Sequence, residues 1–346
     1  MANIVKKTLF ANPQSVFIRI FGMFFRICNK MNNIKPFRAH LSMLTAAAIW
    51  GLMAPLGKDA MNNGLDGISM VSFRVLGAAV LFWTASFFVK SERVPRRDRF
   101  LFAGAALLGI VFNQCLYTVG LSFTSPVNAS IVTTSMPIFA MILSFFILKE
   151  PITWRKAGGV FAGCCGAVML VLTSMSAADG RVGDVRGDLM CMGAQMSFAL
   201  YLSVFNHLIK KYSVVTVNKW MFAWSAILIL PFSAVHVVGL SWADIPVKTW
   251  LETGYVVVFG TFVSYLLSIA GQRVLRPTVV SVYNYVQPIV SVVITVLMGL
   301  GVFTWPQAVA IILVFTGVGL VVKSKSRKDQ LEADSSKGNA QMRGVE

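Results

Sequence analysis

The sequence repeats itself once, and each matched residue of the second copy lies 151 positions after its partner. The clearest copies are 125–156, SPVNASIVTTSMPIFAMILSFFILKEPITWRK, and 276–307, RPTVVSVYNYVQPIVSVVITVLMGLGVFTWPQ. The matches are mostly glycine, proline, threonine and tryptophan rather than the abundant aliphatic types. They include Pro126 and Pro277, Pro137 and Pro288, Thr153 and Thr304, Trp154 and Trp305, Gly109 and Gly260, and Gly166 and Gly317. An internal repeat constrains the architecture before any single residue does.

Apolar residues form blocks of about 20, the length that an α-helix needs to cross a bilayer. The 346-residue chain is 56% hydrophobic and 13% charged, whereas about 25% of a soluble chain is charged. The blocks lack the alternation of barrel strands, and backbone groups in lipid must pair internally. We therefore predict an all-α polytopic membrane protein with ten transmembrane helices, at 40–60, 67–89, 99–121, 125–147, 155–175, 187–209, 215–239, 250–271, 277–300 and 304–323.

The loops between these helices share their basic residues very unequally. One set of alternate loops, together with both termini, holds 26 lysines and arginines, and the other set holds 4. Basic residues accumulate in cytoplasmic loops, so we predict that both termini are cytoplasmic. The net charge of +17 is then explained by the lipid bilayer and its orientation rule, without nucleic acid as a partner.

Helices one to five (38–175) and six to ten (186–323) form the two predicted repeats, and because five is odd the second repeat is inverted relative to the first. Inverted repeats are typical of secondary transporters. Residues 1–37 are basic and contain no acid. We interpret them as an amphipathic surface helix, a targeting segment, or an extension that precedes a true start at Met31. The polar residues 324–346 are predicted to form a disordered cytoplasmic tail.

Three stretches carry a family pattern: AAAIWGLMAPLGK (46–58), SFRVLGAAVLF (72–82) and MPIFAMILSFFILKEPITWRKAGGVFAGCCGAVMLV (136–171). In this order the chain resembles the drug/metabolite transporter superfamily, in its ten-helix EamA-like branch. The resemblance implies a helix bundle around a central cavity, and export or exchange of small metabolites such as amino acids across a bacterial inner membrane. The family's acidic residue after helix four is Glu150, but its repeat counterpart is Gly301, which argues against a mechanism that needs a symmetric pair of acids.

Polar residues lie on one face of helix nine and at the matching positions of helix four. Ser281, Asn284 and Gln287 are each three residues apart, so they share a helical face. Polar groups are costly in lipid and therefore face the protein interior. We predict a substrate cavity there, although hydrogen bonding between packed helices would give the same pattern. The predicted lining residues from the two helices are Asn284, Gln287, Ser281, Thr133 and Ser130.

Helices three and eight add further polar or aromatic candidates. Asn113 and Tyr117 are four residues apart and can face one cavity together, and Tyr265 lies in the matching part of helix eight. Trp50 and Tyr201 occupy matching places in helices one and six. Their rings are predicted to stack on substrate, whereas core packing or a position at the membrane interface remains the alternative for each.

Arg74 is the cation that lies well inside a predicted span. It is a candidate for binding a substrate carboxylate or phosphate. Two alternatives are that it extends to the membrane surface or pairs with Asp66. Pro137 and Pro288 are predicted to kink helices four and nine, either as gating hinges or as purely structural features.

The sequence shows no pattern of residues that indicates an enzyme. No Asp or Glu lies in the middle of a span, no His pair has metal-binding spacing, and the five cysteines lack zinc spacing. We expect no enzyme activity, no metal and no cofactor. Glycine-rich faces on helices five and ten serve as scaffold, within the chain or in a homodimer.

The predicted function is that of a secondary transporter, which moves a small-molecule substrate, such as an amino acid or a related compound, by alternating access, in the export direction. The alternatives are an exchanger of phosphorylated or nucleotide-linked sugars and a non-transporting membrane assembly protein. The predicted location is the bacterial inner membrane.

Overall fold

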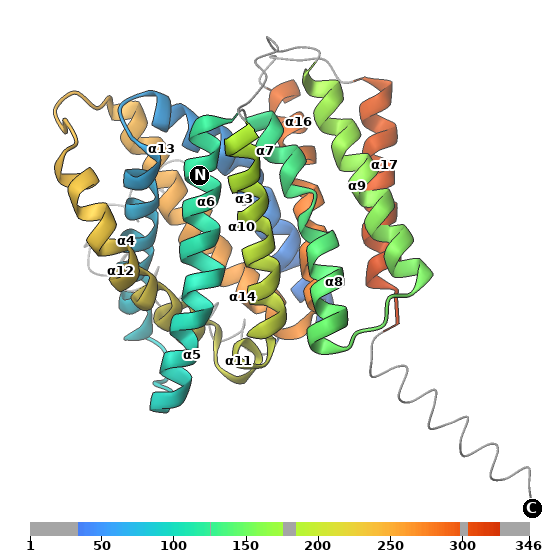
Figure 1. Ribbon diagram of the computed structural model, residues 1–346, viewed down its shortest axis with the longest axis horizontal. Coiled ribbons are helices and arrows are strands. Elements are labelled where there is room, and N and C mark those ends of the chain that lie inside the picture. Colours follow the sequence, from blue (N-terminus) through green and yellow to red (C-terminus); the bar gives the residue numbers. More distant parts are fainter. Residues whose placement is uncertain (1–33, 125, 176–184, 298–303, 326–346) are drawn as a thin grey trace, which may run out of the picture.

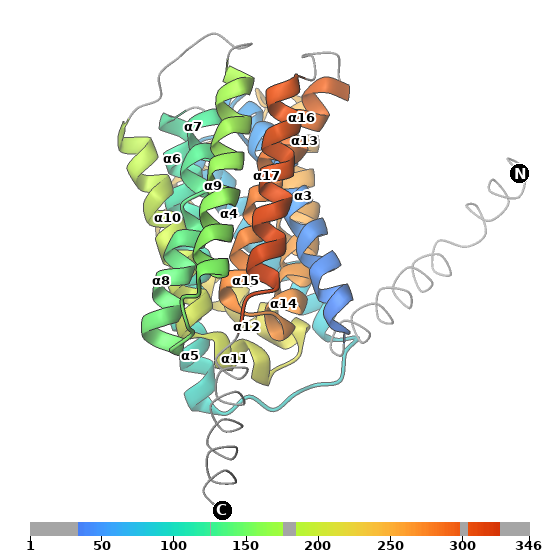
Figure 2. The same cartoon turned by 90° about the vertical axis from the view of Figure 1, so that its right-hand side faces the viewer.

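The computed structural model describes residues 34–124, 126–175, 185–297 and 304–325, and every regular element in these ranges is helical (Figure 1). The predictions for residues 1–33 and for the tail from 326 onward lie outside the described residues. The helices stand side by side in one bundle, with their axes along a common direction (Figures 1 and 2).

The described residues form ten membrane-length helical segments, as predicted, and four of these are interrupted. Seven are long and apolar enough by themselves to qualify as spans. In chain order the elements are α3 (Pro36–Asn62), α4 (Gly67–Ser86), α5 (Arg96–Ala106) with η1 (Leu107–Phe112) and α6 (Asn113–Phe123), α7 (Pro126–Thr133) with α8 (Met136–Leu148), α9 (Trp154–Met175), α10 (Val185–Val204), the short α11 (Asn206–Lys211), α12 (Val214–Val238), α13 (Val247–Val257) with η2 (Val258–Val263) and α14 (Ser264–Val274), α15 (Pro277–Val282) with η3 (Tyr283–Tyr285) and α16 (Val286–Leu297), and α17 (Trp305–Val322).

The interruptions recur at the repeat spacing. Two of them, η1 and η2, are π-helical turns whose boundaries differ by 151 residues. The fourth and ninth helices are also interrupted at matching positions: α7 ends at Thr133, and its repeat counterpart Asn284 lies in the 3-10 turn η3. Such turns widen or break a helix and are frequent at functional sites. The two halves of the chain therefore share backbone irregularities as well as sequence.

The two halves interlock, because the first helix of each half packs on the other half. Helix α3 packs against α13, α14 and α16, while α10 packs against α6 and α8. Trp50 on α3 donates a hydrogen bond to the Gly260 carbonyl in η2, at 3.1 Å. Tyr201 on α10 lies against Gly109 in η1, where a Cβ atom would be 2.7 Å from the ring. These contacts are repeat counterparts, and they draw both π-helical turns toward the centre of the bundle.

Helices α9 and α17 lie side by side (Figure 2) and approach very closely through glycines. A Cβ atom at Gly166 would lie 2.7 Å from the Ala310 carbonyl oxygen, and one at Gly317 would lie 2.5 Å from that of Gly159. Backbones can approach this closely only where side chains are absent. This pair is scaffold at the edge of the bundle, away from its centre.

Candidate functional site

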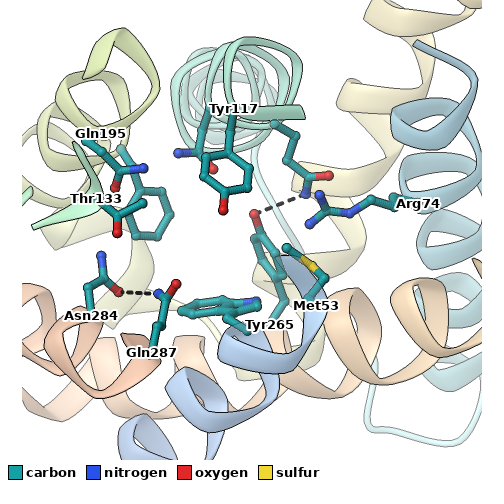
Figure 3. A pocket seen from close by; sticks show the side chains of 12 residues that line it. Met53, Arg74, Tyr117, Thr133, Gln195, Tyr265, Asn284 and Gln287 are labelled. Carbon is teal, nitrogen blue, oxygen red and sulfur yellow. Dashed lines mark hydrogen bonds between the residues drawn. The ribbon is translucent and has the colours of Figure 1, made fainter. Parts of the chain in front are cut away.

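A cavity of about 70 Å³ lies between the helices of the bundle (Figure 3). Its walls come from helices of both halves. The lining residues are Trp50 and Met53 on α3, Arg74 on α4, Asn113, Gln114 and Tyr117 on α6, Thr133 on α7, Gln195 and Phe198 on α10, Tyr265 on α14, Asn284 in η3 and Gln287 on α16. Of the eleven residues predicted to bind substrate, eight line this cavity.

The breaks in helices four and nine bring the side chains of Thr133 and Asn284 to the cavity. Pro137 and Pro288 lie in the first turns of α8 and α16. A proline has no N–H to donate to the carbonyl four residues earlier, which here belongs to Thr133 or to Asn284. Both helices therefore open at the same depth, and both of these residues lie at the cavity. Discontinuous helices near the bilayer midplane are a frequent feature of transporter binding sites.

The two π-helical turns bring a second pair of residues, Gln114 and Tyr265, to the cavity. Gln114 follows η1 and Tyr265 follows η2, and the Gln114 amide donates to the Tyr265 hydroxyl at 3.1 Å. The two residues are 151 positions apart, so they are repeat counterparts in contact. A contact between counterparts lies on or near the axis that relates the two halves. The cavity is therefore built around this axis.

Arg74 is buried, with 5% of its surface exposed, and it enters the cavity from one side (Figure 3). Its guanidinium donates to the hydroxyls of Thr261, at 3.2 Å, and Thr118, at 3.4 Å. Asp66 pairs instead with His236, at 2.9 Å. Arg74 thus neither reaches the membrane surface nor pairs with Asp66, and within the described residues its partners are all neutral.

The opposite side of the cavity is lined by amides and hydroxyls (Figure 3). Gln287 donates to the Asn284 side-chain oxygen at 3.2 Å, and Asn284 donates to the Met136 sulfur at 2.7 Å. Gln195 and Thr133 complete this side. Aromatic rings lie between the two sides, with Trp50 and Tyr265 packed edge to face at 6.0 Å. The cavity therefore has one cationic end, one neutral hydrogen-bonding end and an aromatic middle.

Three predicted residues are not part of the described lining. Tyr201 is buried behind it and donates to Gln272 at 3.1 Å. Ser281 donates to the Thr278 carbonyl within its own helix, and the side chain of Ser130 lies outside the described part of the chain. The lining residues that were not among the predicted substrate-binding residues are Met53, Gln114, Gln195 and Phe198.

The two ends of the bundle differ in packing. Helices α8 and α15 pack against each other, whereas their repeat counterparts α16 and α7 make no comparable contact among the described residues (Figure 2). At the closed end Glu150 forms a buried ion pair with Lys156, at 2.7 Å, and Thr278 on α15 donates to Glu150 at 3.5 Å. Beside it, Lys211 donates to Asp98, and this hydrogen bond raises the pKa of Lys211.

Comparison with known proteins identifies the architecture. The model of the EamA-like transporter family matches residues 37–172 and 185–323, one match for each half. The chain belongs to the EamA-like transporter family. It is therefore a multi-pass membrane transporter of the drug/metabolite transporter superfamily, and the family and its relatives are transporters rather than enzymes.

Individual relatives agree with this assignment. The chain is 22% identical to the uncharacterized transporter YetK of Bacillus subtilis (strain 168), over 88% of this chain and 92% of that protein. It is 25% identical to an S-adenosylmethionine/S-adenosylhomocysteine transporter of Chlamydia muridarum (strain MoPn / Nigg), over 74% of this chain and 82% of that protein. A solved crystal structure matches with a TM-score of 0.64 and 19% identity, over 82% of this chain and 98% of that one, which supports the fold.

Proposed function

We propose that this EamA-like transporter carries small metabolites that bear one carboxylate, namely amino acids or related compounds, out of the cell across the bacterial inner membrane. The observation that carries this proposal is Arg74, a buried cation at the cavity with only neutral partners among the described residues. An unpaired charge in a low-dielectric interior is strongly unfavourable. A substrate carboxylate that forms two charge-assisted hydrogen bonds with the guanidinium offsets that cost.

The number of cations limits the substrate class. Among the described lining residues, Arg74 is the single charged side chain. A phosphorylated or nucleotide-linked sugar carries two or more negative charges and would need several cations at the site. A monocarboxylate matches the one guanidinium, so we place the sugar-phosphate exchanger below the amino-acid carrier.

The volume of the cavity also supports a small amino acid as the substrate. A cavity of about 70 Å³ holds roughly five water molecules, since each needs about 10–15 Å³ by this measure. That is comparable to a small amino acid. The chlamydial relatives are named as transporters of S-adenosylmethionine and S-adenosylhomocysteine, which also carry an amino-acid carboxylate. These compounds are the second candidate class, and they require a wider cavity than the one described.

Alternating access fits the difference between the two ends of the bundle. With both termini in the cytoplasm, the closed α8–α15 end faces the cytoplasm and the α7–α16 end faces outward. Exchange of the two repeat conformations would close α7 on α16 and open α8 from α15. Pro137 and Pro288 would serve as the hinges of this exchange. The export direction rests on the family resemblance.

The test is transport by purified protein in liposomes. Labelled amino acids should exchange across the membrane, and flux should fall to background in the Arg74→Gln variant while that variant keeps its thermal stability. Sugar phosphates should neither move nor compete. Absence of flux for a broad set of carboxylates with folded protein, or equal flux in the variant, would contradict the proposal.

A further inference from the structure

Gln195 differs from every other amide at the cavity. The side-chain amides of Asn113, Gln114, Asn284 and Gln287 each donate a hydrogen bond to a protein partner; that of Asn113 bonds the Ala194 carbonyl at 3.0 Å. The Gln195 side chain forms no hydrogen bond with any described residue, although it lines the cavity and is only 6% exposed. Because this amide lines the cavity and has no protein partner, the group that satisfies its hydrogen bonds must come from what occupies the cavity.

The surroundings of Gln195 define what could satisfy it. In Figure 3 it lies beside Thr133 and on the side of the cavity away from Arg74. The described lining residues at this end carry no charge. A carboxamide offers one acceptor and two donors in a plane, so its best partner is an uncharged planar group that presents a donor next to an acceptor. A charged group would lack a counter-ion at this end.

We propose that Gln195 is the second anchor of the transported substrate and that it pairs with a carboxamide-like group at the end opposite the carboxylate. This inference rests on the proposed function for the carboxylate end alone. Carboxamides and the edges of nucleobases share the required donor and acceptor pattern, so the substrate is an amino acid with a polar, uncharged, planar distal group. The aromatic rings between the two ends hold its apolar middle.

The experiment compares glutamine with homoleucine, in which methyl groups replace the amide atoms, as competitors of labelled amino-acid flux in liposomes. Glutamine should compete at least about tenfold better in the unmodified protein, because a site built for hydrogen bonds rejects an analogue that lacks them. In Gln195→Met this preference should vanish. S-adenosylhomocysteine as a third competitor distinguishes a nucleobase edge from a carboxamide: in either case the preference over homoleucine must depend on Gln195.

Gln272→Met is the matched control. The Gln272 amide donates to Ser268 at 2.8 Å and accepts from Tyr201, outside the cavity lining. This variant should lose thermal stability and keep the preference, whereas Gln195→Met, which breaks no bond, should keep its stability. Equal competition by glutamine, S-adenosylhomocysteine and homoleucine in the unmodified protein, or a preference that survives in Gln195→Met, would overturn the inference. Failure of all carboxylates to compete would instead overturn the proposed function.

Discussion

The two repeats of this transporter have the same helix interruptions but different side chains at the cavity. The π-helical turns η1 and η2 match at 151 residues, as do the breaks at Thr133 and Asn284. The side chains differ at the same positions: Met136 corresponds to Gln287, and Trp50, which lines the cavity, corresponds to Tyr201, which does not.

This difference separates two requirements. Alternating access needs two halves that can exchange conformations, which favours equivalent backbones. A small metabolite has no such symmetry, so its recognition needs side chains that occur in one half and not in the other. Arg74 is the strongest case, because the residue 151 positions later is Ser225. Positions that match are expected to control folding and motion, and positions that differ are expected to control selectivity.

The largest effect should come from matched scaffold glycines. Gly166→Leu and Gly317→Leu each place a side chain against the backbone of the partner helix, so both should lose about 3 kcal/mol of stability or fail to fold. Gly158→Leu and Gly319→Leu meet no atoms within 4 Å and should be tolerated. Thermal unfolding in detergent compares the four variants. A well-folded Gly166→Leu protein would show that the α9–α17 packing is wrong.

Two cysteine pairs should report opposite states of the cavity. Met136 and Asn284 are in contact in this structure, and the repeat spacing transfers that contact to Thr133 and Gln287 in the exchanged state. In a background without the five native cysteines, Met136→Cys with Asn284→Cys should crosslink before substrate is added. Thr133→Cys with Gln287→Cys should crosslink in the opposite state. Conditions that raise the crosslinking yield of one pair should lower that of the other. Crosslinking yields that rise together would exclude the exchange of the two repeat conformations.

The repeat counterparts Trp50 and Tyr201 should differ in their effect on substrate affinity. Trp50→Phe should weaken substrate affinity about 3- to 10-fold, because Trp50 lines the cavity. It should also cost about 1 kcal/mol of stability, because it removes the hydrogen bond to the Gly260 carbonyl. Tyr201→Phe removes the hydrogen bond to Gln272 and should cost about 1 kcal/mol of stability with unchanged affinity. Competition assays and thermal unfolding of both variants measure the two effects. Equal losses of affinity would place Tyr201 at the site after all.

The smallest effect is expected from the hinge prolines. Alanine restores an N–H that can bond the carbonyl of Thr133 or Asn284, which favours a continuous helix. Pro137→Ala and Pro288→Ala should lower the maximal transport rate a few-fold and leave the apparent affinity unchanged. Initial rates over a range of substrate concentrations separate the two quantities. A change confined to affinity would assign the prolines to binding rather than to motion.

Much of this organisation was predictable from the sequence, for identifiable reasons. Apolar blocks and basic loops indicate ten helices, and a polar residue such as Asn284 is conspicuous within an apolar helix. Gln195 is also polar, but its counterpart is Leu44, so the repeat did not point to it. The π-helical turns have no sequence marker, because they depend on packing between distant helices. The partners of Arg74 come from helices three and eight, and no local pattern joins them.

The most direct test of the account is a comparison of one amino acid with the amine that remains after removal of its carboxylate. In the unmodified protein the amino acid should bind at least about 30-fold more tightly, the equivalent of about 2 kcal/mol for a buried charge pair. In Arg74→Gln the two compounds should bind equally, with the affinity for the amine unchanged. A preference for the carboxylate that persists in Arg74→Gln would contradict the assignment of Arg74 as the substrate anchor.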